Sequence, residues 1–148
     1  MTNAIRVARR RPGRATERGQ GLVEFSIAIT VFLLLVMGTI DLGRAVYQFN
    51  GASQAARELA RVASVHPGGT LGTSSQVTST LAAQRGLVPG LGTPTYACID
   101  IAGATVTGPC NGGNWVRVTI SSSFFPVTPL AGLIGTVTLT SSASAKIE

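Results

Sequence analysis

The feature that most constrains this chain is an apolar run near its start. Phe25 to Ile40 reads FSIAITVFLLLVMGTI, and Leu22 and Val23 extend it toward the N-terminus. Together these residues approach the ~20 that an α-helix needs to cross a bilayer. The run therefore predicts a membrane-spanning helix.

Glu24 interrupts the run two residues after it begins. A carboxylate costs roughly 2.5 to 3.5 kcal/mol at the centre of a bilayer and less near its edge. We expect Glu24 either to lie at headgroup depth or to pair with a positive charge.

The formal net charge of +6 lies mostly ahead of Gly19. Six of the twelve basic residues, all Arg, precede Gly19, against one acid, Glu17. The rest of the chain is nearly neutral, so it has no cationic face that could follow a nucleic-acid backbone. Basic residues that flank an apolar helix stay in the cytoplasm, which predicts a cytoplasmic N-terminus and an extracytoplasmic C-terminal part. A nucleic-acid-binding arm remains the alternative for the basic block.

A secretory signal peptide is the competing interpretation of the apolar run. Its apolar core is about 7 to 15 residues long and ends in a small-residue cleavage site. The run here is longer, and Gly38-Thr39-Ile40-Asp41-Leu42 is a poor site. We predict that the segment stays attached.

We expect the helix to continue beyond the apolar run, over residues 20–66 in all, with the membrane-spanning part ending at about residue 41. A helix of this length measures about 70 Å, more than twice a bilayer core, so half of it projects from the membrane. Pro67, Gly68 and Gly69 should end it. A spacing of 100° per residue places one set of residues on a single, mostly apolar face, which we expect to pack against the chain's own sheet: Leu42, Ala45, Val46, Phe49, Ala52, Ala56, Leu59, Ala60 and Ala63.

Residues 67–148 are richer in Thr, Ser, Gly and Val and predict a small head. Ser74 or Ser75 can cap a short helix that stops at Gly86. Alternating apolar residues predict an antiparallel sheet, so the fold class is α+β, with a long N-terminal helix on the sheet. The predicted strands are Thr95–Ile101, Trp115–Ser122 and Thr136–Ile147, with a further short piece at Ala104–Thr107 and a turn at Asn111–Asn114.

Cys98 and Cys110 are the only cysteines, and both lie on the side predicted to be translocated. An oxidising compartment favours a disulfide between them, whereas a metal site would need further His or Cys ligands. We predict a disulfide, with two free buried thiols as the alternative.

The segment Phe124 to Gly135, FFPVTPLAGLIG, is apolar for a connection between strands. Loops of this kind most often cover their own core. The alternative is an exposed surface that docks on neighbouring subunits or on the membrane.

Catalytic residues are hard to find in the sequence. The single histidine, His66, has no Ser and carboxylate arrangement around it, and the acids beyond the apolar run are scattered. The Gly-rich stretch before residue 75 lacks the Lys of a phosphate-binding loop. We therefore predict no enzyme activity, no cofactor and no metal site.

Residues 18–25, RGQGLVEF, resemble the processing site of type IV prepilins. The short Arg-rich leader and the Glu-Phe pair are similar to those of the Flp/Tad pilus system. Residues 18–65 as a whole resemble the TadE-like pseudopilins, which are minor pilins of that system. The resemblance implies a pilin-like fold, with the extracytoplasmic domain as its head.

The resemblance also implies specific roles for residues at the start of the helix. A prepilin peptidase would cut after Gly19, remove residues 1–19 as a leader and leave Gln20 as the mature N-terminus. Glu24 and Phe25 would then serve subunit assembly, with Glu24 attracting the N-terminus of an adjacent subunit. Gly21 is a rival cleavage site, but it would leave Glu24 at the third mature position.

The sequence and the resemblance together predict a non-catalytic minor pilin in the cytoplasmic membrane. Its expected partners are the prepilin peptidase, other pilin subunits, the inner-membrane assembly platform and membrane lipid, and not nucleic acid. The alternative is an uncleaved single-span anchor that carries an extracytoplasmic binding module.

Overall fold

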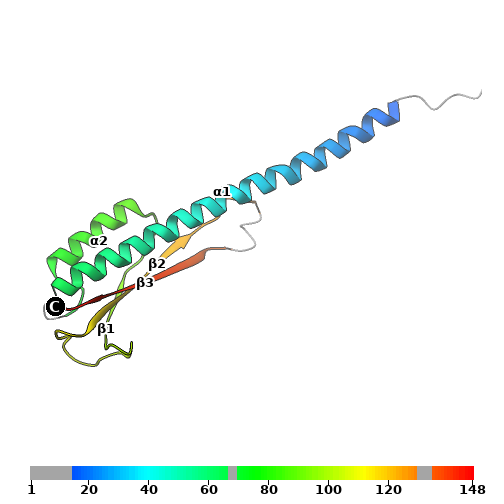
Figure 1. Cartoon of the computed structure of the whole chain (residues 1–148). Coiled ribbons are helices and arrows are strands. Elements are labelled where there is room, and N and C mark those ends of the chain that lie inside the picture. The colour runs from blue at the N-terminus through cyan, green and yellow to red at the C-terminus, as the bar shows by residue number, and fades with distance from the viewer. Residues whose placement is uncertain (1–14, 67–69, 130–134) are drawn as a thin grey trace, which may run out of the picture. The chain divides into compact units, whose positions relative to one another are not determined.

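The structure, a computed structural model, describes residues 15–66, 70–129 and 135–148, with side chains from Gly19 onward. In these residues the elements follow the order helix, helix, strand, strand, strand (Figure 1). They are α1 (Ala15–Val65), α2 (Ser75–Leu87), β1 (Thr95–Ile99), β2 (Trp115–Phe124) and β3 (Val137–Lys146).

The chain divides into two units, the first ending at Met37 and the second running from Gly38 to Glu148. α1 contributes to both. It begins at Ala15, five residues before the start predicted from the sequence, which is Gln20. Pro12 and Gly13, which disfavour a helix, lie upstream of this start. The rest of the predicted leader, residues 1–14, lies outside the described residues.

The first unit contains the apolar part of α1. Residues 19–65 form the one described helix that is long and apolar enough to cross a membrane, and its most apolar part is not buried within the structure. The large side chains here are exposed, among them Phe25, Phe32 and Leu35. This helix is consistent with a single-pass membrane anchor.

In the second unit, β2 is the central strand of a three-stranded antiparallel sheet with the order β1-β2-β3. Val118 pairs with Tyr96 on one side and with Ala143 on the other. Every second residue of β2 from Val116 to Phe124 is buried. The predicted α+β fold, with alternating residues facing a helix, is therefore confirmed.

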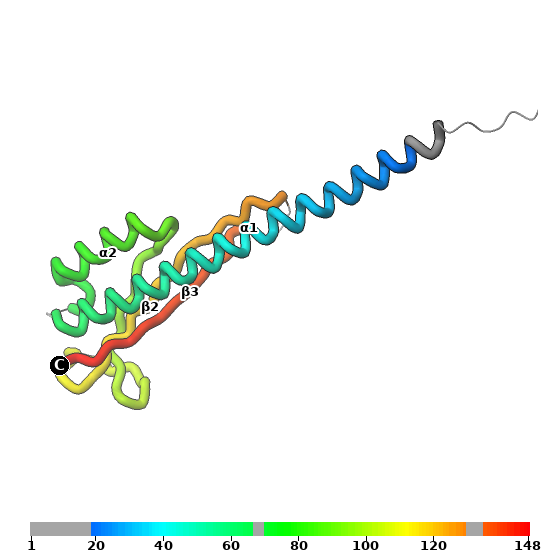
Figure 2. Tube along the Cα trace, turned by 45° about the horizontal axis from the view of Figure 1, so that its top comes forward, coloured from blue at the N-terminus to red at the C-terminus, as the bar shows by residue number. Residues whose placement is uncertain are grey.

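The core of the second unit lies between this sheet and the C-terminal half of α1. Figure 2 shows that half of α1 running along the sheet, with α2 beside it. The helix side of the core consists of small residues and one leucine, and the sheet side of β-branched residues. The most buried members are Ala52, Ala55, Ala56, Leu59, Ala60 and Ala63 from α1, Val77 from α2, and Val116, Val118 and Ile120 from β2.

The prediction that the apolar face of α1 packs on the sheet is wrong at the N-terminal end of that face. Leu42, Val46 and Phe49 are exposed, whereas the arc from Ala52 onward is buried as expected. The residues of α1 that turn toward the head in this region include Asp41 and Gln48, which hydrogen-bond to the segments before and after the sheet strands. Hydrogen bonds of Asp41 and Gln48 therefore help to hold the beginning of the head to the helix.

α2 begins as the sequence predicts and ends later. Ser74 is its N-cap, and its Oγ accepts a hydrogen bond from the Val77 N–H at 3.4 Å. Gly86 is not the stop, because the helix continues through Leu87 and the Val88 N–H still donates to the Gln84 carbonyl. Val88 is the first buried residue of the connection, so packing decides where the helix ends.

The predicted strands are confirmed with small shifts at their ends. β1 stops at Ile99 because Asp100 opens a turn, with its carbonyl accepting from Gly103 and its carboxylate accepting from Ala104 at 2.8 Å. The short piece around Thr105 bridges to Ile99. The turn at Asn111 to Asn114 is closed by a hydrogen bond of 3.2 Å.

The face of the sheet that points away from α1 carries hydroxyl side chains. Thr119 of β2 stands between Thr95 of β1 and Ser142 of β3, and Ser121 stands opposite Thr140. Thr140 and Ser142 are exposed. One face of the sheet is thus polar and open, as is common for antiparallel sheets.

Candidate functional site

The predicted cleavage and assembly residues lie together on the first part of α1. Gly19, Gln20, Glu24 and Phe25 are all exposed on the helix surface. Gln20 and Glu24 are one helical turn apart, so they share a face. Within the described residues Glu24 forms no ion pair. A charged partner for it must come from outside this part of the chain.

Two hydroxyl side chains of the apolar run, those of Ser26 and Thr30, are hydrogen-bonded within the helix itself. Ser26 Oγ donates to the Leu22 carbonyl at 2.8 Å, and Thr30 Oγ1 donates to the Ser26 carbonyl at 2.7 Å. A hydroxyl that bonds to the preceding turn has little need of water. The run can therefore lie in lipid or in a helix bundle at little cost, which leaves Glu24 as its one awkward group.

A comparison with protein families identifies this part of the helix. Residues 19–61 match the family described as TadE-like protein. The resemblance predicted from residues 18–65 is thereby confirmed. The TadE-like match begins at Gly19 and ends within the amphipathic half of α1, before α2 and the sheet. It indicates a Tad pilus-associated protein. No curated protein and no solved structure matches the chain.

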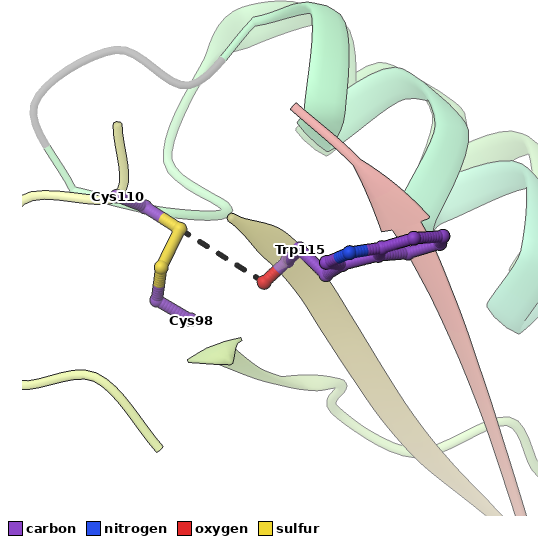
Figure 3. The surroundings of a disulfide bond; sticks show 3 residues. All are labelled: Cys98, Cys110 and Trp115. Carbon is purple, nitrogen blue, oxygen red and sulfur yellow. Dashed lines mark hydrogen bonds between the residues drawn. A yellow bond between two sulfur atoms is a disulfide. The ribbon is translucent and has the colours of Figure 1, made fainter. Parts of the chain in front are cut away.

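The TadE-like helix is followed by a head that carries the predicted disulfide. Cys98 on β1 and Cys110 in the loop before β2 are bonded, with a Cα–Cα distance of 5.6 Å (Figure 3). Cys110 Sγ lies 3.9 Å from the carbonyl oxygen of Trp115, the first residue of β2. The bond therefore ties the connection between β1 and β2 to the end of both strands.

Asp41 holds a role that sequence reasoning missed, because its partners are 86 and 87 residues away in the chain. Its Oδ2 accepts hydrogen bonds from the Val127 and Thr128 N–H groups, each at 2.9 Å. Its Oδ1 accepts one from Arg44 Nη1 at 3.1 Å. The residue is only 7% exposed. Asp41 thus pins the loop after β2 to α1, directly after the apolar run.

The pKa values of two acids on α1 reflect their different surroundings. Burial acts to raise the pKa of Asp41, but the hydrogen bonds from Val127, Thr128 and Arg44 outweigh it and hold the pKa below its usual value. The pKa of Glu58 is lowered mainly by its hydrogen bonds from Arg61. Both carboxylates are therefore charged at neutral pH, and only Asp41 connects two distant parts of the chain.

Two further contacts join α1 to the end of β2. Gln48 Nε2 donates to the carbonyls of Pro89 and Ser123, the second at 3.2 Å. The guanidinium of Arg44 lies 5.6 Å from the centre of the Phe124 ring, within the range of a cation–π interaction. A groove here contains one charged group, that of Arg44, and is lined by Ile40, Gly43, Arg44, Tyr47, Gln48, Pro89 and Phe124.

The described residues contain no group of three or more His, Cys, Asp or Glu side chains that could hold a metal ion. His66 is exposed at the end of α1, with its Nδ1 3.2 Å from the Val62 carbonyl. The Asp100 carboxylate caps a local turn. The TadE-like match is to a structural, pilus-associated family, and it gives no positive evidence of catalysis.

The apolar segment after β2 has buried residues, as a segment that covers its own core would, and exposed residues, as a docking surface would. Phe124 and Pro126 are buried within the chain, which favours the interpretation that the segment covers the chain's own residues. Phe125 and Val127 are 59% and 62% exposed. The apolar residues from 130 to 134 lie outside the described residues. The alternation of buried and exposed residues shows that the segment presents two faces.

Proposed function

We propose that this chain is a minor pilin, or pseudopilin, that supports assembly of a Flp/Tad-type pilus. The observation that carries the proposal is the TadE-like match over residues 19–61, which begins at the predicted cleavage glycine. The chain acts as a structural subunit, held in the cytoplasmic membrane by α1 with its head outside the cytoplasm. It acts before assembly as a membrane protein and afterwards as part of, or a primer for, the filament.

The exposed apolar half of α1 supports this role. Burial of apolar area is worth about 25 cal/mol per Å², so large side chains left in water carry a considerable cost. In the first unit Phe25, Phe32 and Leu35 are each more than half exposed. Lipid covers them in the membrane, and neighbouring helices replace lipid in a filament.

Processing supplies the charge that Glu24 lacks. A prepilin peptidase that cuts after Gly19 frees the α-amino group of Gln20, one helical turn from Glu24 in the same chain. In a bundle of helices an unpaired carboxylate would cost several kcal/mol, so it must pair. The freed α-amino group of an adjacent subunit is the partner we propose, and this pair sets the register between subunits. The assembly platform in the inner membrane then extracts the subunit.

Mass spectrometry of the protein from its native membrane tests the processing step. We expect a mature N-terminus at Gln20. An intact leader beginning at Met1 would contradict the proposal and favour an uncleaved anchor with a binding module as its head. A mature N-terminus at Leu22 would move the cut to Gly21 and remove the one-turn spacing to Glu24.

A pair of glycine variants sharpens this test. Gly19→Val should block cleavage, whereas Gly21→Val should leave it largely intact. A Cβ at either position meets no atom within 4 Å, so the two variants start from equally open surroundings. Loss of cleavage in Gly21→Val alone would reassign the site.

A further inference from the structure

The loop that follows β2 presents two large apolar side chains to the outside at the point where the apolar run of α1 ends. Phe125 and Val127 are 59% and 62% exposed, and they flank Pro126, which is buried. Asp41, the residue immediately after Ile40, binds the Val127 and Thr128 N–H groups at 2.9 Å. The loop is therefore fixed at the level of residue 41 along the helix.

The backbone of this loop leaves few N–H groups unbonded, which suits surroundings of low polarity. Pro126 has no N–H group, and the next two N–H groups are both bonded to the Asp41 carboxylate. An unsatisfied backbone N–H costs several kcal/mol away from water, which keeps ordinary loops out of the apolar layer of a membrane. Three consecutive residues, Pro126 to Thr128, present no free N–H, so this penalty does not arise at these residues, of which Val127 points outward.

We propose that the loop from Phe125 to Thr128 rests in the outer interfacial layer of the membrane, with Phe125 and Val127 inserted among the lipids. The interfacial layer is about 5 to 7 Å thick on each side of a bilayer, and one helical turn rises about 5.4 Å. A loop pinned to the first residue after the spanning run lies within that layer. The proposal rests on the membrane insertion of α1 in the proposed function and adds a second point of contact for the head.

Arg44 fits the same surface. It lies one helical turn after Asp41, its side chain is 50% exposed, and it is paired to Asp41 Oδ1 at 3.1 Å. That position corresponds to the depth of lipid phosphates, which attract cations. The pinned loop and Arg44 together hold the base of the head against the membrane before assembly.

Fluorescence quenching by brominated lipids tests the depth of the loop. The full chain carries one tryptophan, Trp115, which is replaced by Phe to give a silent background. Single tryptophans are then placed by Phe125→Trp, by Leu33→Trp in the apolar run and by Thr140→Trp on the open face of the sheet. Each protein is reconstituted into vesicles of phosphatidylcholine and phosphatidylglycerol, with bromine either near the headgroup or near the chain end.

We expect the tryptophan at position 125 to lose most emission with bromine near the headgroup. The one at position 33 should lose most with deep bromine, and the one at position 140 should lose none. If position 33 is quenched and position 125 is not, the inference is wrong and the membrane anchor stands. If position 33 is not quenched either, the proposed insertion of α1 fails as well.

Two further results test whether lipid or a second copy of the chain covers the loop, and whether Asp41 sets the depth of the loop. A blue-shifted but unquenched emission at position 125, rising with the protein-to-lipid ratio, would assign the loop to a second copy of the chain and overturn the proposal. Asp41→Ala, added to the 125 reporter, should reduce shallow quenching because the loop is released, and Asp41→Asn should do so less. Glu58→Ala, which removes an acid–arginine pair of the same spacing, should change nothing. Equal quenching in the Asp41 and Glu58 variants would show that Asp41 does not set the depth.

Discussion

The two halves of α1 differ in which apolar residues they bury, although they belong to one continuous helix: the first half exposes large side chains and the second half buries small ones. Between Leu22 and Ile40 the helix carries large side chains such as Phe32 and Leu35, and most of these are more than half exposed. From Ala52 to Ala63 it carries alanines and Leu59, and these are 0% or 1% exposed. The larger apolar area thus lies on the half that the chain itself does not cover.

Side-chain size explains this difference. Small residues let the backbone of a helix approach the sheet closely, so alanine suits a contact inside the subunit. Large apolar side chains on a helix without an internal partner need lipid or another helix to cover them. The second half therefore serves the fold, whereas we propose that the first half serves contacts with lipid and other molecules. Substitutions in the two halves should then have different consequences.

The largest effect expected is on assembly and comes from the first half. Glu24→Gln keeps the shape of the side chain and removes the charge that we propose pairs with the N-terminus of an adjacent subunit. We expect membrane insertion and peptidase cleavage to persist and pili to be absent, as judged by electron microscopy and by the pilus content of sheared fractions. Normal pili at equal subunit abundance would show that charge pairing at this position is not the mechanism.

Two leucines of α1 compare the halves directly. Leu59→Ala creates a cavity in the core and should destabilise the head by about 2 to 5 kcal/mol. Leu33→Ala removes the same atoms from a side chain that is 51% exposed, and the head should keep its stability. Denaturant unfolding of the full chain in detergent, followed by Trp115 fluorescence, measures both. Equal losses would mean that the two halves are not energetically separate.

The disulfide belongs to the head alone. Replacing Cys98 and Cys110 by Ser opens a loop of about a dozen residues and should lower the free energy of unfolding by about 3 kcal/mol in the chain-entropy model. Peptidase cleavage at Gly19 should be unaffected, and both are measured on the same sample. If the double variant is cleaved poorly, the stability of the head affects the processing site, and the two halves of α1 are not independent.

The smallest effects come from two glycines that differ only in what lies beside them. A Cβ at Gly51 would meet the Val88 side chain at 2.8 Å, so Gly51→Ala should cost about 1 kcal/mol after the gain in helix propensity. A Cβ at Gly43 meets no atom within 4 Å, and Gly43→Ala should leave stability equal or raise it by up to about 1 kcal/mol. A stabilising Gly51→Ala would show that Val88 can move aside freely.

Properties that depend on neighbouring residues were predictable from the sequence. The apolar run, the alternation in β2 and β3, the cap at Ser74 and the cysteine pair all follow from side-chain type and spacing. They led to the α+β class, the disulfide and the TadE-like resemblance. The role of Glu24 and the cut after Gly19 remain predictions, because they concern partners that the chain does not contain.

Tertiary structure decided what depends on contacts between distant residues. The helical spacing placed Leu42, Val46 and Phe49 on the core face, yet the head meets α1 there through Asp41 and Gln48 and leaves all three exposed. Asp41 looked like a scattered acid, since no local pattern relates it to N–H groups 86 and 87 residues away. A periodic pattern shows which residues share a face, but where the partner surface begins and ends is fixed only when the chain folds back upon itself.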